Sequence, residues 1–305
     1  MIHGKHSIAV MVALVVVAAG CGGQGSGATS KGPSTPGGIV EWGAGDPAPS
    51  GLSHVTSVAA GGGFNLALKS DGTVVGWGYG GSGQTAIPGG LTGVVAVAAG
   101  NDFGLALKSD GTVVGWGDDT YGQTDVPAGL SGVAAISAGH AFGLALKSDG
   151  TVVAWGGVGY GETKVPAGLT SVKAISAGGY HALALKTDGT VVAWGFDNNG
   201  QADVPAGLSG VVSVAGGSDF SLALRKDGTV TAWGRNDVGQ TGASGLSGVT
   251  AIAAGYQHSL ALKSDGTVVS WGSNLAGKTN VPAGLSGVTA VAAGQDQSLA
   301  VTGRG

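Results

Sequence analysis

The chain of 305 residues has little charge and almost no sulfur, with 10% charged residues, one cysteine and two methionines. A single cysteine excludes an internal disulfide. The 14 Lys and Arg residues form no basic run, and 18 Asp and Glu residues outnumber them to give a formal net charge of -4. This balance argues against a nucleic-acid partner.

Long hydrophobic runs are missing after residue 19. The one extended apolar run, from Ile8 to Ala19, is too short to span a bilayer comfortably. Lys5 precedes it and Ala18-Ala19-Gly20 follows it, which is the layout of an export signal over residues 1–20. Lys5 is the only Lys, Arg, Asp or Glu in that segment, so its removal changes the net charge from -4 to -5.

Cys21 follows the small residues directly. The segment resembles the lipobox of bacterial lipoproteins, although Ala18 stands where that family more often has leucine. The resemblance implies that the Cys21 thiol is acylated, which would anchor an exported protein to a membrane of the cell envelope on the extracytoplasmic side. The alternative is a buried or free thiol. Residues 21–36 have no periodic apolar face and are typical of a flexible Gly/Ser tether.

The remaining sequence is repetitive. Seven tryptophans lie at positions 42, 77, 116, 155, 194, 233 and 271, so the four central spacings are all 39 residues. A complete unit contains three short segments of alternating or small apolar residues, such as VAVAAG, FGLALK and GTVVGWG within residues 94–127. This pattern predicts strands and an all-β fold. We expect the tryptophans to cover interfaces between the units.

An Asp-Gly pair separates the second and third segments of each unit, and it predicts a tight hairpin in which both residues have positive φ. Turn chemistry explains these aspartates without a metal. They are Asp71, Asp110, Asp149, Asp188, Asp227 and Asp265. The following segment, such as QTDVP, is predicted to be a fourth, outer strand, since proline is tolerated at a sheet edge.

Units of about 39 residues built from short strands predict the blades of a β-propeller over residues 37–305. The last unit stops where its third strand would begin, and GGIVEWG at the other end supplies a third strand alone. We therefore predict seven blades, the last closed by residues 37–43 pairing with the C-terminal segment, which removes the exposed sheet edges. Glu41 lies in this strand where the other units have Gly, Ala or Ser, at an interface or facing the channel.

The motif order resembles the regulator of chromosome condensation repeat family, which forms seven-bladed propellers. AGYQHSLALKSDGTVVSWG at 254–272 and AGGYHALALKTDGTVVAWG at 177–195 carry the resemblance, which covers residues 38–302. It implies the fold, while the function varies across that family. The repeat length looks closer to a secreted bacterial propeller that inhibits β-lactamases, although only Tyr180 provides an aromatic ring at that family's aromatic position.

The connections predict one uniform and one variable face. The second and fourth connections change little between units, whereas the first and third vary, and alternating strands place these two on the same face. We predict that this variable face binds a partner, or else that its loops diverged without function. The candidate residues are Asp102, Asp118, Asp119, Tyr121, Tyr160, Tyr180, Phe196, Asp197, Asp219, Arg235, Asp237, Tyr256 and Asp296.

No motif indicates catalysis, a metal or a cofactor. The histidines after residue 20 fall in different units without metal-ligand spacing, and no serine has a neighbouring base. The sequence therefore predicts a monomeric, non-catalytic module that binds a protein with a basic surface. Inhibition of an extracytoplasmic enzyme (β-lactamase-like or transpeptidase) and cell-wall glycan binding are the alternatives.

Overall fold

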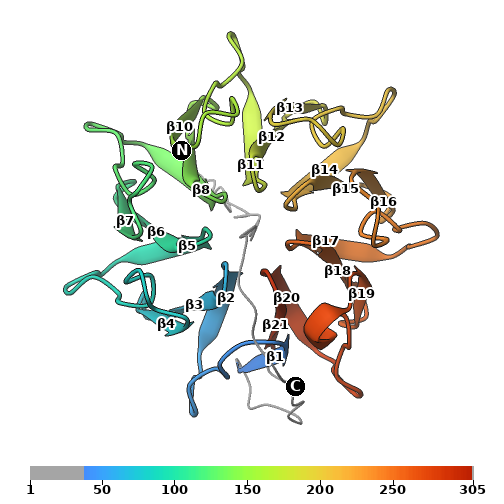
Figure 1. The fold of residues 1–305 in the computed structure, drawn as a ribbon, viewed down its shortest axis with the longest axis horizontal. Coiled ribbons are helices and arrows are strands. Elements are labelled where there is room, and N and C mark those ends of the chain that lie inside the picture. The colour runs from blue at the N-terminus through green and yellow to red at the C-terminus, as the bar shows by residue number, and fades with distance from the viewer. Residues whose placement is uncertain (1–37, 304–305) are drawn as a thin grey trace, which may run out of the picture.

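A computed structural model describes residues 38–303 and shows seven three-stranded antiparallel sheets arranged around a central axis (Figure 1). The predicted signal peptide at 1–20, the tether at 21–36 and Cys21 lie outside the described residues. The all-β, seven-bladed prediction is confirmed. Among residues 38–303, no helix is long and apolar enough to cross a membrane.

Six blades are continuous in sequence. Their strands are β2 (Val55–Ala60), β3 (Phe64–Lys69) and β4 (Val74–Gly78); β5 (Val94–Ala99), β6 (Phe103–Lys108) and β7 (Val113–Gly117); β8 (Val133–Ala138), β9 (Phe142–Lys147) and β10 (Val152–Gly156); β11 (Val172–Ala177), β12 (His181–Lys186) and β13 (Val191–Gly195); β14 (Val211–Gly216), β15 (Phe220–Arg225) and β16 (Val230–Gly234); and β17 (Val249–Ala254), β18 (His258–Lys263) and β19 (Val268–Gly272). We number these blades 1 to 6 in chain order.

The seventh, closing blade joins both ends of the described chain. β1 (Ile39–Gly43) pairs antiparallel with β21 (Gln297–Thr302), which pairs with β20 (Val288–Ala293). The register sets Trp42 opposite Ser298. Figure 1 shows β1 lying beside β21 at the outside of this blade. The predicted closure by residues 37–43 is consistent with this pairing.

The core lies between neighbouring sheets. Strand residues of blade 1 such as Phe64 and Leu66 are fully buried and belong to one apolar cluster with Leu299 of the closing blade. Small residues allow this close approach. A Cβ on Gly104 would collide with the indole of Trp116, its cross-strand partner.

The hairpin between the second and third strands differs from the prediction in its turn type. The amide of Gly72 donates to the carbonyl of Lys69, and Gly72 has a φ of 79°, but Asp71 is absent from the residues with positive φ. The loop is therefore a three-residue connection with a left-handed glycine. Asp71 accepts hydrogen bonds from the Thr73 amide and hydroxyl, which confirms its turn role.

The predicted fourth strand is wrong. In blade 1 the segment after Gln84 bonds within its own turns, where Ala86 donates to Gly83 and Ile87 donates to Thr85. The Gln84 carbonyl accepts from the Trp116 indole of the next blade at 2.9 Å. These backbone groups are then not available for a β ladder. The same indole-to-carbonyl bond recurs for Trp155, Trp194, Trp233 and Trp271, so the tryptophans link neighbouring blades as expected.

Glu41 lies at the interface between the closing blade and blade 1. Its carboxylate accepts from the Trp77 indole, the Asn65 side chain and the Ala48 amide at 3.1 to 3.3 Å. It thus gives Trp77 the acceptor that a backbone carbonyl gives the tryptophans of blades 2 to 6. Burial raises the pKa of Glu41 to about 7, and the three hydrogen bonds oppose that rise only in part.

Two buried histidines also link blades. His181 bonds the Ser221 hydroxyl of the next blade at 2.9 Å, and His258 bonds Ser298 at 2.8 Å. Burial lowers the pKa of His181 to about 4 and that of His258 to about 3, so both rings are neutral near pH 7. At the equivalent interface after the closing blade, Gln297 donates to Asn65. These contacts give both histidines a structural role.

Candidate binding face

A ring of backbone hydrogen bonds surrounds the axis at the first connections. The amide at the start of each connection donates to a carbonyl of the next blade at 3.0 to 3.3 Å, as Asn101 does to His140 and His140 to Gly179. The ring closes where Gln295 of the last blade donates to Gly61 of the first. The backbone of this surface is therefore uniform, although its side chains differ.

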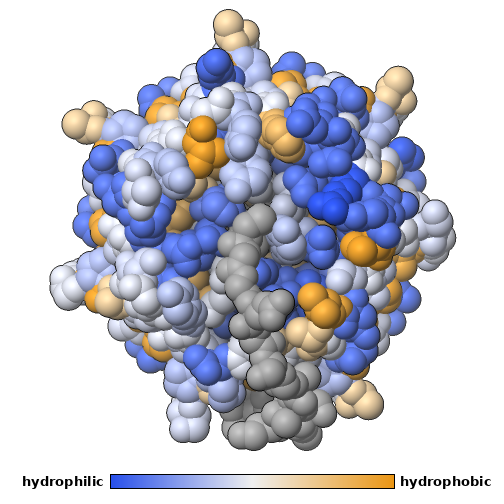
Figure 2. All heavy atoms as spheres, in the orientation of Figure 1, coloured by the Kyte–Doolittle hydropathy of each residue, from blue (hydrophilic) through white to orange (hydrophobic). Residues whose placement is uncertain are grey.

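The first and third connections lie on one face, as the variable-face prediction requires. In every blade, the residue after the third strand donates to a carbonyl of the first connection at 2.8 to 2.9 Å. Examples are Asp118 to Asp102 and Phe196 to Tyr180. This face is turned to the viewer in Figure 1, where η1 (Leu275–Gly277) of a third connection lies in front. Figure 2 shows hydrophilic residues gathered near its middle, with apolar residues as separate patches.

One position in the third connection carries varied side chains, and in four blades its backbone amide has the same support. The support is the buried residue two places later: the side-chain oxygen of Gln123 accepts from the Tyr121 amide at 2.8 Å, and Gln201 accepts from Asn199 at 2.9 Å. Gln84 and Gln240 act in the same way. Blades 3 and 6 differ, because Glu162 accepts from Val158 and Gly159 and Lys278 bonds Asp296. We call this place the display position. Blades 1 to 6 carry Ser82, Tyr121, Tyr160, Asn199, Val238 and Ala276 there.

Four aromatic side chains meet across blades 3 and 4. The Tyr160 ring lies 5.3 Å from Tyr180 and 5.0 Å from Phe196, and the His140 ring lies 4.9 Å from Tyr180, measured between centroids. We call His140, Tyr160, Tyr180 and Phe196 the aromatic cluster. Tyr160 remains 53% exposed, whereas the other three are half-buried. The cluster therefore combines fixed packing with an accessible ring.

Carboxylates adjoin the aromatic cluster on the side of blade 2. Burial and the nearby charge of Asp118 raise the pKa of Asp102, although an Asn101 hydrogen bond opposes this rise. Asp118 accepts from the Gln123 amide at 2.5 Å and from the Thr120 hydroxyl at 2.7 Å. Burial lowers the pKa of His140, and the charge of Asp118 acts against that shift. The backbone links the same residues, since the Asp118 amide donates to Asp102 and the Asn101 amide donates to His140. Asp197 follows Phe196 on the other side and is exposed.

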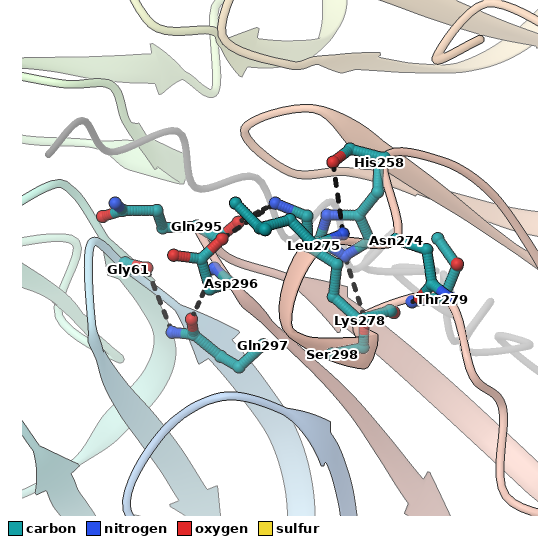
Figure 3. A network of polar contacts seen from close by, with 11 residues as sticks. Gly61, His258, Asn274, Leu275, Lys278, Thr279, Gln295, Asp296, Gln297 and Ser298 are labelled. Atoms are coloured by element: carbon teal, nitrogen blue, oxygen red, sulfur yellow. Dashed lines mark hydrogen bonds and ion pairs between the residues drawn. The ribbon is translucent and has the colours of Figure 1, made fainter. Parts of the chain in front are cut away.

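Elsewhere on the face, carboxylates pair with cations of the chain itself. Arg235 pairs with Asp219 at 3.4 Å and with Asp237 at 2.5 Å. In the closing blade, the buried Lys278 ammonium bonds Asp296 at 2.8 Å and the Gln295 carbonyl at 3.0 Å (Figure 3). Within residues 38–303, none of the ion pairs involves Asp102, Asp118, Asp119 or Asp197.

The structure divides the predicted residues into separate groups. Tyr160, Tyr180 and Phe196 come together in the aromatic cluster, of which Tyr121 and Tyr256 are not members. The prediction omitted His140, whose equivalents are mostly small or polar, and Tyr79, which is 60% exposed on the same face. The described residues contain no group of three or more His, Cys, Asp or Glu side chains suited to a metal.

Comparisons with known proteins agree with this geometry. The model of the regulator of chromosome condensation (RCC1) repeat matches residues 55–84, 94–123, 133–162, 172–201, 211–240 and 249–278. These segments cover more than half of the chain, and each runs from a blade's first strand to Gln84 or its equivalent. The chain therefore belongs to the RCC1 repeat family. No curated protein matches it.

Solved structures of the same fold include Prp20p from Saccharomyces cerevisiae, with a TM-score of 0.71 and 20% identity over 87% of this chain and 91% of that one. Human WBSCR16 has a TM-score of 0.68 and 20% identity over 82% and 87% of the two chains. The ectodomain of the receptor kinase CR4 from Physcomitrella patens has a TM-score of 0.66 and 23% identity over 79% and 68%. These likenesses establish the fold. The structure of Prp20p is described together with the binding of Prp20p to Gsp1p and histones.

Proposed function

We propose that this chain is an exported, lipid-anchored propeller that binds a protein partner through its variable face, without catalysis. The observation that carries the proposal is the display position, where Ser82, Tyr121, Asn199 and Val238 differ while the hydrogen bond to the glutamine two places later is kept. Variation confined to side chains on a uniform backbone is typical of a recognition surface. Protein binding by Prp20p, a propeller of the same fold, supports this class of function.

The binding proposal is tested with changes that the chain itself contains. Tyr121→Ser and Tyr160→Ser place at two display positions the residue that blade 1 has as Ser82. The partner is first cross-linked to the chain in intact cells and then purified. We expect the double variant to bind it about tenfold more weakly than the wild-type chain, or weaker still, because aromatic residues dominate interface energies. Isothermal titration measures the change.

The matched control is the pair Thr112→Ser and Thr151→Ser, in hairpins of blades 2 and 3 that join the second and third strands on the uniform face. These hydroxyls bond Asp110 and Asp149, so serine keeps the contact. Equal affinity of the wild-type chain and the display variant would refute binding through the variable face. A β-lactamase or transpeptidase as the partner would favour inhibition as the particular function.

Anchoring through Cys21 has its own test. We expect Cys21→Ser to move the protein from the membrane fraction to the soluble fraction, because serine cannot accept the thioether-linked lipid that the lipobox resemblance implies. Cell fractionation and intact mass of the purified chain measure the outcome. A wild-type mass without a lipid increment would show that the anchor is absent, and it would leave the binding proposal standing.

A further inference from the structure

The aromatic cluster and its flanking carboxylates share a chemistry that the rest of the face lacks. Asp118 acts electrostatically on His140 of the cluster, and Asp197 is the residue next to Phe196. Neither carboxylate takes part in an ion pair within residues 38–303. In blade 5, by contrast, Arg235 stands at the position equivalent to Asp118 and pairs with Asp219 and Asp237.

Aromatic faces and carboxylates together select for a planar cation. A cation over an aromatic ring is attracted by the ring's quadrupole, and a guanidinium also stacks on the ring and donates in a fork to a carboxylate. The Arg235 pairs with Asp219 and Asp237 show that this surface accommodates such a fork between a first and a third connection. In blades 2 to 4 the acceptors and the rings are present, and among residues 38–303 no Lys or Arg forms an ion pair with Asp118 or Asp197.

We propose that the aromatic cluster, with Asp118 and Asp197 at its edges, binds a guanidinium group presented by a basic segment of a protein partner. This inference rests on the proposed function, and it adds the chemistry of the partner and the part of the face that holds it. The repulsion between Asp102 and Asp118 favours the same occupant, because a cation beside them lowers the cost of both charges.

A neutral sugar fits the site less well. Sugar binding relies on rings lying face-on beneath the ligand and on amide or hydroxyl partners, whereas Tyr160 packs edge-on at 75° to Tyr180. A neutral sugar would also leave the charges of Asp118 and Asp197 uncompensated. Glycan binding is therefore an outcome that the experiment distinguishes.

The experiment uses the chain's five tyrosines as reporters. The protein is labelled with 3-fluorotyrosine, and fluorine NMR follows titration with a blocked Gly-Arg-Gly-Arg-Gly peptide, with its citrulline analogue, and with a cell-wall muropeptide. We expect the Tyr160 and Tyr180 resonances to shift saturably with the arginine peptide alone. Tyr79 serves as the internal control, since it is 60% exposed but lies outside the cluster.

Variants separate charge from stacking. Asp118→Asn and Tyr160→Ser are each expected to lower the affinity for the arginine peptide about fivefold, while Tyr79→Ser leaves this affinity unchanged. Asp197→Asn, at an exposed residue, provides a second charge variant should Asp118→Asn alter folding, and thermal melting checks each chain. Rising salt should weaken binding in parallel.

Three results would overturn the inference: no saturable shift, equal shifts with arginine and citrulline, or shifts caused by the muropeptide instead. The proposed function fails separately. Suppose that the purified partner binds the wild-type chain, that Asp118→Asn leaves its affinity unchanged, and that only substitutions in other blades weaken binding. Protein binding then holds and the guanidinium site does not.

Discussion

A chain that begins at Ala44 is expected to melt about 10 °C or more below a chain that begins at Gly37, and to form oligomers. The shorter chain loses the antiparallel pairing of β1 with β21 and the burial of Val40 and Trp42. Burying two such side chains contributes about 4 kcal/mol, and each kcal/mol shifts the melting temperature of a domain this size by about 2 to 4 °C. β21 would also become an exposed edge open to pairing with another chain.

Scanning calorimetry and light scattering on the two purified chains measure both effects. The chain that begins at Gly37 is the matched control, because it lacks the same N-terminal residues but keeps β1. A monomeric shorter chain with an unchanged melting temperature would contradict closure by this strand.

Glu41→Gln is expected to stabilise the protein above pH 7 relative to the wild-type chain. Burial raises the pKa of Glu41 from its usual 4.5 to about 7, so the folded protein holds this proton more tightly than the unfolded chain. The stability that this proton provides is complete below pH 4.5 and is lost as the pH rises through 7. The pKa shift of about 2.5 units corresponds to a destabilisation of the wild-type chain by about 3 kcal/mol above pH 7. Glutamine avoids this destabilisation but loses up to one hydrogen bond, which costs about 1 kcal/mol.

Urea denaturation of both chains at intervals between pH 4 and pH 9 measures this difference. The buried histidines titrate in both chains, so their contributions cancel when the free energies of unfolding of the two chains are subtracted at each pH. Asp71→Asn is the control: hydrogen bonds from Thr73 lower the pKa of Asp71 to about 2, so this change should have no pH-dependent effect in that range. A constant difference between the wild-type chain and Glu41→Gln across the range would contradict an ionisable Glu41 at the interface.

Much of the fold could be predicted because the same pattern of strand segments recurs in each repeat unit. Three strand segments, the interfacial tryptophans and the missing strand of the last unit follow from aligning the chain with itself. The turn type did not follow, because Asp-Gly fits both the two-residue loop and the three-residue loop that Gly72 adopts. The outer strand was wrong because the tolerance of proline at a sheet edge does not reveal that the Trp116 indole donates to the Gln84 carbonyl.

The candidate site was less accessible to sequence reasoning. The repeat identified which connections share a face and so found Tyr160, Tyr180 and Phe196 individually. Their contact depends on side-chain packing between neighbouring blades, which a repeat period does not encode. The same limit applies to charge: Asp102 and Asp219 occupy equivalent positions in the repeat, but among the described residues only Asp219 pairs with an arginine. His140 could have been found as the one aromatic ring beginning a first connection in blades 2 to 4.

The contacts that link neighbouring blades also specify the order of assembly. Nearly identical blades could close into rings of the wrong size or exchange between chains, as repeat proteins do when they misassemble. Here Gln297 meets Asn65, and Glu41 meets Trp77, only where the last blade joins the first. His258 likewise finds its serine in the closing blade. These differing contacts favour closure into one ring of seven blades over other arrangements. The dissimilar blades of the variable face therefore take the same positions in every molecule.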